Sequence, residues 1–147
     1  MGSTFYSLHY HIVFSTKERR PLIRQEWRAR LHEYLGGTVR GLGGVAESVG
    51  GVEDHVHLLV SLKTIHAPAD LTRELKKASS VWAAEHHEPV FAWQEGYAIF
   101  TVSWTHVPVL RRYIAAQEAH HQKTPIADEL KRLLEKNGVS YDPKYLL

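Results

Sequence analysis

The fold is decided by the stretch Val-Glu-Asp-His-Val-His-Leu-Leu-Val-Ser-Leu, residues 52–62. Apolar and polar residues alternate along it with a period of two, which predicts a β-strand with one face in an apolar core. The apolar face consists of Val56, Leu58, Val60 and Leu62. His55 and His57 lie two residues apart, so both imidazoles project together from the opposite face.

The segments around this strand predict three further strands and two helices. Alternation of the same kind indicates strands at 5–15, 45–49 and 97–103. Apolar residues at helical spacing indicate helices at 22–42 and 68–86. The order βαββαβ is typical of an α+β, ferredoxin-like (RRM-like) fold with an antiparallel sheet, whose first and third strands are central neighbours.

Two more helices are expected after this core, at 107–121 and 125–137. Residues 1–147 are therefore interpreted as a single domain of three parts. The ferredoxin-like core covers about 5–103, a helix that contains Tyr113 covers about 106–121, and a C-terminal helix with a tail covers 125–147. Two crossover helices cover one face of such a sheet, so the other face is open for these later helices or for a ligand.

The amino-acid composition limits the kinds of site that this chain can form. Cysteine is absent, which excludes disulfides and thiolate metal sites. Histidine is abundant, with 11 residues, and the formal net charge is only +2, which permits nucleic-acid binding without requiring it. No long apolar run is present, so we expect neither a signal peptide nor a membrane span, and a cytoplasmic location.

Two elements together offer a metal site and a nucleophile. His55 and His57 on a rigid strand make half of a divalent-metal site, although two structural histidines would give the same pattern. Tyr113, Gln117 and His121 are spaced i, i+4 and i+8, so they share one stripe of the predicted helix. The pairing offers a nucleophile and a third ligand on the helix opposite two ligands on the strand.

The sequence resembles the single-tyrosine HUH transposases of the IS200/IS605 type, in the IS200-like branch close to the REP-associated tyrosine transposases. Five ordered segments carry the resemblance between about Tyr6 and His121. They are YHIVFSTKER (10–19), VEDHVHLLVS (52–61), LKKASSVW (75–82), WQEGYAIFTVS (93–103) and YIAAQEAHH (113–121).

This resemblance implies a metal-dependent DNA strand transferase. It identifies His55 and His57 as metal ligands, Gln117 as the residue that completes the metal site, and Tyr113 as the nucleophile. The expected cofactor is Mg²⁺ or Mn²⁺, with no nucleotide cofactor, because a 5′-phosphotyrosine link conserves the energy of the cut bond. The expected partners are single-stranded DNA with hairpin ends and a second copy of the chain in a homodimer.

Several basic residues are candidate phosphate contacts, with a solvated charged surface as the alternative for each. They are Lys17, Arg19, Arg20, Arg73, Lys76, Lys77, His11 and His121. His11 also belongs to a second H-x-H pattern, His9-Tyr-His11. It is interpreted as a group that supports the metal ligands or faces DNA, with direct binding to the metal as the alternative.

Three alternative functions remain at this point. A domesticated REP-associated HUH nuclease would use the same residues. A replication initiator or relaxase of the HUH class fits the short chain and the position of Tyr113 less well. A non-catalytic RRM-like module would expose aromatic residues on the two central strands, where this sequence places histidines.

Overall fold

The computed structural model describes residues 2–121 and 124–146, and of residues 120 and 121 only the backbone. Four strands form one antiparallel sheet in the order β2-β3-β1-β4. Their bounds are β1 His9–Ser15, β2 Val45–Gly51, β3 His55–Ser61 and β4 Ala98–Val102. The ferredoxin-like order with β1 and β3 in the centre is confirmed.

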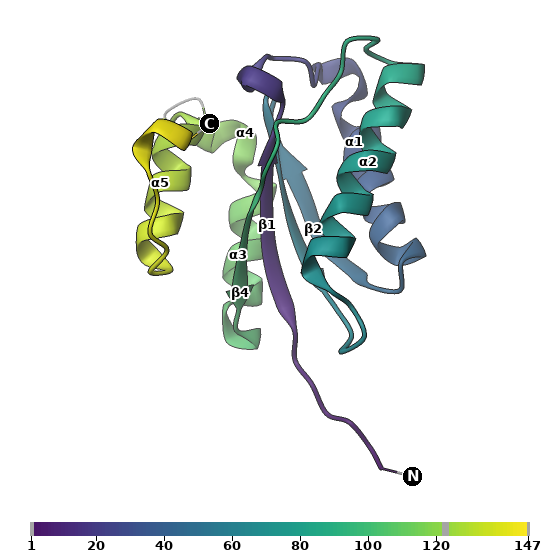
Figure 1. The fold of residues 1–147 in the computed structure, drawn as a ribbon, viewed down its shortest axis with the longest axis vertical. Helices are drawn as coiled ribbons and strands as arrows, with labels where there is room; N and C mark the ends of the chain where they lie inside the picture. Colours follow the sequence, from purple (N-terminus) through teal and green to yellow (C-terminus); the bar gives the residue numbers. More distant parts are fainter. Residues whose placement is uncertain (1, 122–123, 147) are drawn as a thin grey trace.

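Helices cover both faces of this sheet (Figure 1). One layer consists of α1 (Gln25–Gly41) and α2 (Pro68–His86). The other side carries α3 (Val107–Ala115), α4 (Gln117–His121) and α5 (Ile126–Lys136). Short 3₁₀ turns lie at Lys17–Arg19, Trp104–His106 and Pro143–Tyr145. None of the helices in the described part of the chain is long and apolar enough to cross a membrane.

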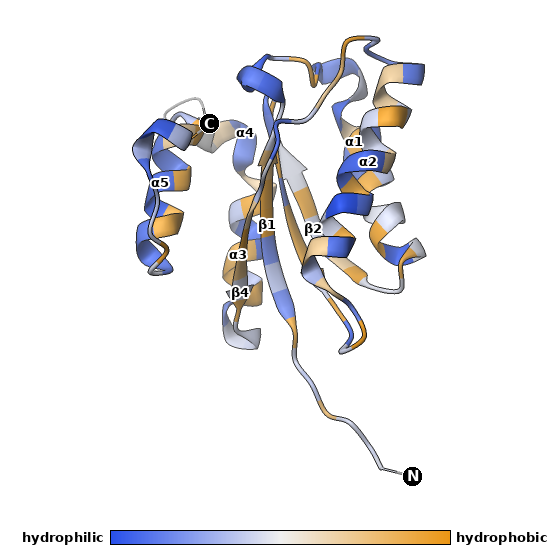
Figure 2. Cartoon of the chain, in the orientation of Figure 1, coloured by the Kyte–Doolittle hydropathy of each residue, from blue (hydrophilic) through white to orange (hydrophobic). Residues whose placement is uncertain are grey.

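The larger hydrophobic core lies between the sheet and the α1–α2 layer. Ile12 and Phe14 of β1 and Leu58 of β3 are at most 1% exposed and belong to one apolar cluster with residues of both helices. Figure 2 shows apolar residues on the strands and on both helices of this layer. The alternation along β3 therefore builds this core, as the sequence indicates.

A smaller apolar cluster joins α3 to the other face of the sheet. It consists of Leu59, Val107, Leu110 and Ile114. Because Leu59 belongs to the same face of β3 as His55 and His57, the cluster places α3 beside the histidines.

Two predicted boundaries are wrong. The strand predicted at 5–15 begins only at His9, because its regular pairing with β3 and β4 ends at Ser61 and Val102, opposite His9. The helix predicted at 107–121 is divided at Ala116, whose backbone (φ −96°, ψ 14°) leaves the helical conformation. The remaining elements lie where the sequence predicts them, with ends shifted by a few residues.

Candidate functional site

The histidines of β3 form the base of the site. His55 and His57 are fully buried on the face of the sheet that α3 covers. Nδ1 of His55 lies 2.7 Å from Oδ1 of Asp54. A hydrogen bond from Nδ1–H to this carboxylate leaves the Nε2 lone pair of His55 available to a cation.

His57 is oriented by the neighbouring strand. Its Nδ1 lies 2.8 Å from Nε2 of His11 on β1, and the two rings stack with centroids 5.0 Å apart. Burial, reinforced by the proximity of His57, lowers the pKa of His11 to about 3. A neutral His11 has one unprotonated ring nitrogen and can accept a hydrogen bond from Nδ1–H of His57. In that tautomer, Nε2 of His57 is the nitrogen that could bind a cation.

Tyr113 lies beside these histidines because α3 packs closely on the sheet. A Cβ on Gly50 of β2 would lie 2.4 Å from the backbone oxygen of Ile114, so only glycine permits this approach. The Tyr113 ring is edge-on to His57, with centroids 5.8 Å apart. The Tyr113 ring therefore lies next to the histidine pair of the same chain.

Gln117 reaches the same centre from the first residue of α4. It is 1% exposed, and its Oε1 lies 3.4 Å from Nε2 of His55. The break of the helix at Ala116 does not separate Gln117 from Tyr113, because Nε2 of Gln117 lies 3.4 Å from the Tyr113 carbonyl oxygen.

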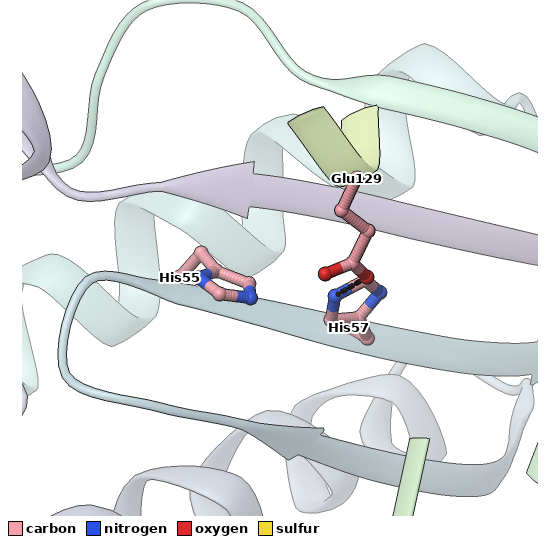
Figure 3. A group of neighbouring side chains, drawn as sticks. All are labelled: His55, His57 and Glu129. Carbon is pink, nitrogen blue, oxygen red and sulfur yellow. Dashed lines mark ion pairs between the residues drawn. The ribbon is translucent and has the colours of Figure 1, made fainter. Parts of the chain in front are cut away.

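Glu129 of α5 is the site residue that the sequence analysis missed. Its carboxylate is buried, with Oε1 3.0 Å from Nε2 of His57, and it accepts a hydrogen bond from the Tyr113 hydroxyl. The candidate ligand atoms of His55, His57 and Glu129 all lie within 4.8 Å of one another (Figure 3). Burial, followed by the hydrogen bond to Glu129, raises the pKa of Tyr113 well above its ordinary value.

A signal for Glu129 is present in the sequence. Ile126, Glu129 and Leu130 are spaced i, i+3 and i+4, and all three are buried. A carboxylate within the apolar stripe of a helix is costly unless it has a partner. That mismatch could have indicated a role for Glu129.

The donors at this centre suit a divalent cation. Two imidazole Nε2 atoms, an amide oxygen and a carboxylate oxygen face one another, and the second nitrogen of each imidazole is already engaged. Nitrogen and oxygen ligands of this kind accommodate Mg²⁺ or Mn²⁺ and also Zn²⁺.

A cleft between α3 and α5 leads to Tyr113. Its volume is about 250 Å³, and its lining includes Tyr113 and Glu129 together with the basic residues His106, Arg132 and Lys136. A cationic rim around a nucleophile is suited to an anionic substrate such as a phosphodiester.

The predicted DNA contacts lie in different parts of the fold. Lys17, Arg19 and Arg20 are exposed at the turn after β1. Arg73, Lys76 and Lys77 belong to α2, which covers the opposite face of the sheet. Lys76 donates to the backbone oxygens of Gln94 and Gly96 (2.7 and 2.8 Å), and Arg73 pairs with Asp70. His11 is buried, and the side chain of His121 lies outside the described residues.

Known proteins share this sequence pattern and this fold. ISDra2 transposase TnpA of Deinococcus radiodurans is 29% identical over 119 residues, which cover 76% of this chain and 85% of that protein. The crystal structure of a candidate transposase from the same organism has a TM-score of 0.66 at 24% identity, covering 80% of this chain and 95% of that one. A REP-associated tyrosine transposase bound to a REP hairpin has a TM-score of 0.61 at 14% identity, covering 82% and 74%.

The family model described as "Transposase IS200 like" matches residues 4–117. That range includes the whole sheet, both histidines of β3, Tyr113 and Gln117, and it ends before α5. The chain belongs to the IS200-like transposase family.

Proposed function

We propose that this chain cuts and rejoins single-stranded DNA through a covalent bond between Tyr113 and a 5′-phosphate. The observation that carries the proposal is the position of the Tyr113 ring 5.8 Å from the ring of His57, in a chain that belongs to a transposase family. A phenol beside a pair of oriented imidazoles has the parts needed for nucleophilic attack at a phosphodiester.

Tyr113 has the central role in this reaction. Its hydroxyl oxygen attacks the phosphorus, and the bond from phosphorus to the 3′ oxygen breaks. The phenolic proton is lost, the leaving oxygen gains a proton, and the products are a 5′-phosphotyrosine and a free 3′-OH. Attack by a 3′-OH on the same phosphorus reverses these steps, so rejoining requires no nucleotide cofactor.

His55, His57 and Gln117 are proposed to hold a divalent cation, Mg²⁺ or Mn²⁺. When bound, this cation would stabilise negative charge on the non-bridging oxygens of the scissile phosphate. His11 and Asp54 lie at hydrogen-bond distance from Nδ1 of the two imidazoles, and metal binding through Nε2 requires the tautomer in which each Nδ1 donates. The three ligands are uncharged, so the centre would remain attractive to a phosphate.

The substrate is proposed to be single-stranded DNA with hairpin ends. The hairpin-bound REP-associated transposase, which shares the fold, supports this choice. An RRM-like module without catalysis is disfavoured, because the central strands present His11, His55 and His57 beneath α3 rather than exposed aromatic residues.

Trapping the covalent intermediate tests the proposal. The protein would be incubated with Mn²⁺ and labelled single strands from the DNA that flanks its gene, then separated in SDS. We expect a labelled protein band that Tyr113→Phe abolishes while DNA binding persists. Tyr145→Phe is the matched control, because Tyr145 is 72% exposed in the C-terminal segment. A band that survives Tyr113→Phe would refute the nucleophile.

We also propose that the chain forms a homodimer, because its resemblance to the single-tyrosine transposases implies one. Sedimentation at micromolar concentration should give twice the mass of the chain. A monomer that forms the labelled adduct would show that one chain is sufficient.

A further inference from the structure

Three polar groups meet at one oxygen of Glu129. The Tyr113 hydroxyl donates to Oε1, Nε2 of His57 lies 3.0 Å from it, and Nε2 of Gln117 lies 3.5 Å from it. The residue is only 3% exposed. Burying a carboxylate is unfavourable without strong compensation, so this convergence requires an explanation.

We propose that Glu129 is a further ligand of the divalent cation, delivered by α5 from outside the part of the chain that matches the family. The inference rests on the proposed function, because it assumes that His55 and His57 bind the cation. It adds a charged oxygen to the neutral ligand set and ties the C-terminal helix to the metal.

The spacing of the donor atoms supports a shared cation. Two atoms bound to one cation at about 2.1 Å lie about 3.0 Å apart at a right angle and about 3.4 Å apart at a tetrahedral angle. Oε1 of Glu129 lies 3.0 Å from Nε2 of His57, and Oε1 of Gln117 lies 3.4 Å from Nε2 of His55. Both pairs therefore have separations expected between ligands of the same ion.

The hydrogen bonds around these ligands agree with the same assignment. Gln117 directs its Oε1 toward His55 and its Nε2 toward Glu129, so one amide could bind the cation and also orient the carboxylate. Since Tyr113 donates to that carboxylate, Glu129 would hold the nucleophile next to the metal. Glu129 is thus a metal ligand and a positioning residue for Tyr113.

The competing explanation is a buried ion pair. His57 would then carry protons on both nitrogens, donating Nδ1–H to His11 and Nε2–H to Glu129. In that arrangement Nε2 of His57 is blocked, and a cation would have to displace Glu129. If Glu129 is a ligand, a bound cation anchors α5. If Glu129 forms an ion pair with His57, the cation displaces Glu129 and loosens α5.

Metal titration of the DNA-free protein distinguishes the metal-ligand role of Glu129 from the buried ion pair. Binding of Mn²⁺ alone would be followed by electron paramagnetic resonance for the wild type, Glu129→Gln, Asp128→Asn and His57→Ala. We expect Glu129→Gln to weaken binding at least tenfold, since even residues that only support ligands contribute about 10–100-fold. Asp128→Asn is the matched control, because it removes one negative charge from an exposed position on the same helix, and its affinity should stay within about twofold.

The outcomes distinguish this inference from the proposed function. If His57→Ala loses Mn²⁺ while Glu129→Gln binds as tightly as the wild type, Glu129 is not a ligand and the metal site of the proposed function stands. If the wild type binds no Mn²⁺, or His57→Ala binds as the wild type does, both the metal site and the role of Glu129 are overturned.

A second measurement needs no variant and so does not depend on the folding of Glu129→Gln. Amide hydrogen exchange in residues 126–136 would be compared with and without Mg²⁺. A ligand role predicts slower exchange when Mg²⁺ is added, because the cation anchors α5 through Glu129. Exchange that is unchanged or faster would favour the ion pair and overturn the proposal.

Discussion

Leu58 and His57 are neighbours on β3, yet they belong to two different environments. Leu58 faces the α1–α2 layer, where the contacts of the larger core are apolar. On the opposite face, the neighbours of His57 are His11 of β1, Tyr113 of α3 and Glu129 of α5. One strand therefore supports stability on one side and places chemical groups on the other.

The difference teaches how each face responds to change. An apolar face depends on the volume and shape of its side chains. The face of β3 that carries His55 and His57, called the polar face below, depends on the direction of its hydrogen bonds and on a few atoms at defined distances. Substitutions on the two sides of β3 should therefore affect different measurements.

The largest expected effect is on the polar side. His57→Ala should lower metal-dependent DNA cleavage by about a thousandfold or more, since a bound cation supplies several kcal/mol of transition-state stabilisation. Initial rates with labelled single-stranded DNA and Mg²⁺ would measure it. His86→Ala, at an exposed position of α2 on the opposite side of the sheet, is the control. Unchanged cleavage rates in His57→Ala would contradict the assignment of a chemical role to the face of β3 that carries His57.

The next effect is on the apolar side. Leu58→Ala should lower the free energy of unfolding by about 2–5 kcal/mol, because it removes a fully buried side chain and leaves a cavity. Urea denaturation would measure the change. Folded Leu58→Ala should still bind Mn²⁺ with an affinity close to that of the wild type. A loss of metal affinity in the folded variant would show that the two faces are coupled.

A smaller effect is expected where α3 contacts β2. Gly50→Ala places a Cβ 2.4 Å from the backbone oxygen of Ile114, so α3 must move away from the sheet. We expect a loss of about 1–3 kcal/mol in the free energy of unfolding, together with less covalent adduct, because Tyr113 moves with α3. Urea denaturation and the adduct assay would measure both quantities.

Gly37→Ala is the control for this substitution. Gly37 lies inside α1, and the nearest group to its added Cβ is the flexible Arg40 guanidinium at 3.7 Å. This variant should be as stable as the wild type or up to about 1 kcal/mol more stable. If Gly50→Ala behaves in the same way, the close approach of α3 does not hold Tyr113 in place.

The sequence predicts the apolar face well because strand periodicity reports burial directly. Val56, Leu58 and Val60 alternate with the histidines, and the structure places all three in the larger core. The same alternation places His55 and His57 on the other face. Sheet order also follows, because few topologies accommodate the order βαββαβ.

The polar face is only partly predictable. The spacing of Tyr113 and Gln117 indicates a shared stripe, but no glycine or proline marks the helix break at Ala116. Glu129 contacts His57, although the two residues are 72 positions apart in the sequence (129 − 57). Local periodicity marks Glu129 as a carboxylate within an apolar stripe but does not identify its partner, so the contact with His57 emerges only from the fold.

The smallest expected effect concerns His32 of α1, which lines a cavity with Gly50 and Gln117 at the edge of the polar face. Burial, and then the positive charge of Arg28, lower the pKa of His32 to about 4. In the unfolded chain it titrates near 6.5. Between these values the unfolded state binds a proton that the folded state resists, so the stability from neutral His32 is complete above pH 6.5 and is lost as the pH falls toward 4.

His32→Gln should therefore lose less stability than the wild type between pH 7 and pH 5, by urea denaturation in EDTA. His106→Gln, at an exposed position, should keep the pH dependence of the wild type. Because His32 is not a proposed ligand, its substitution should leave Mn²⁺ affinity at pH 7 unchanged. If His32→Gln loses as much stability as the wild type over this range, acid sensitivity arises elsewhere, and the cavity beside Gln117 does not hold His32 in its neutral form.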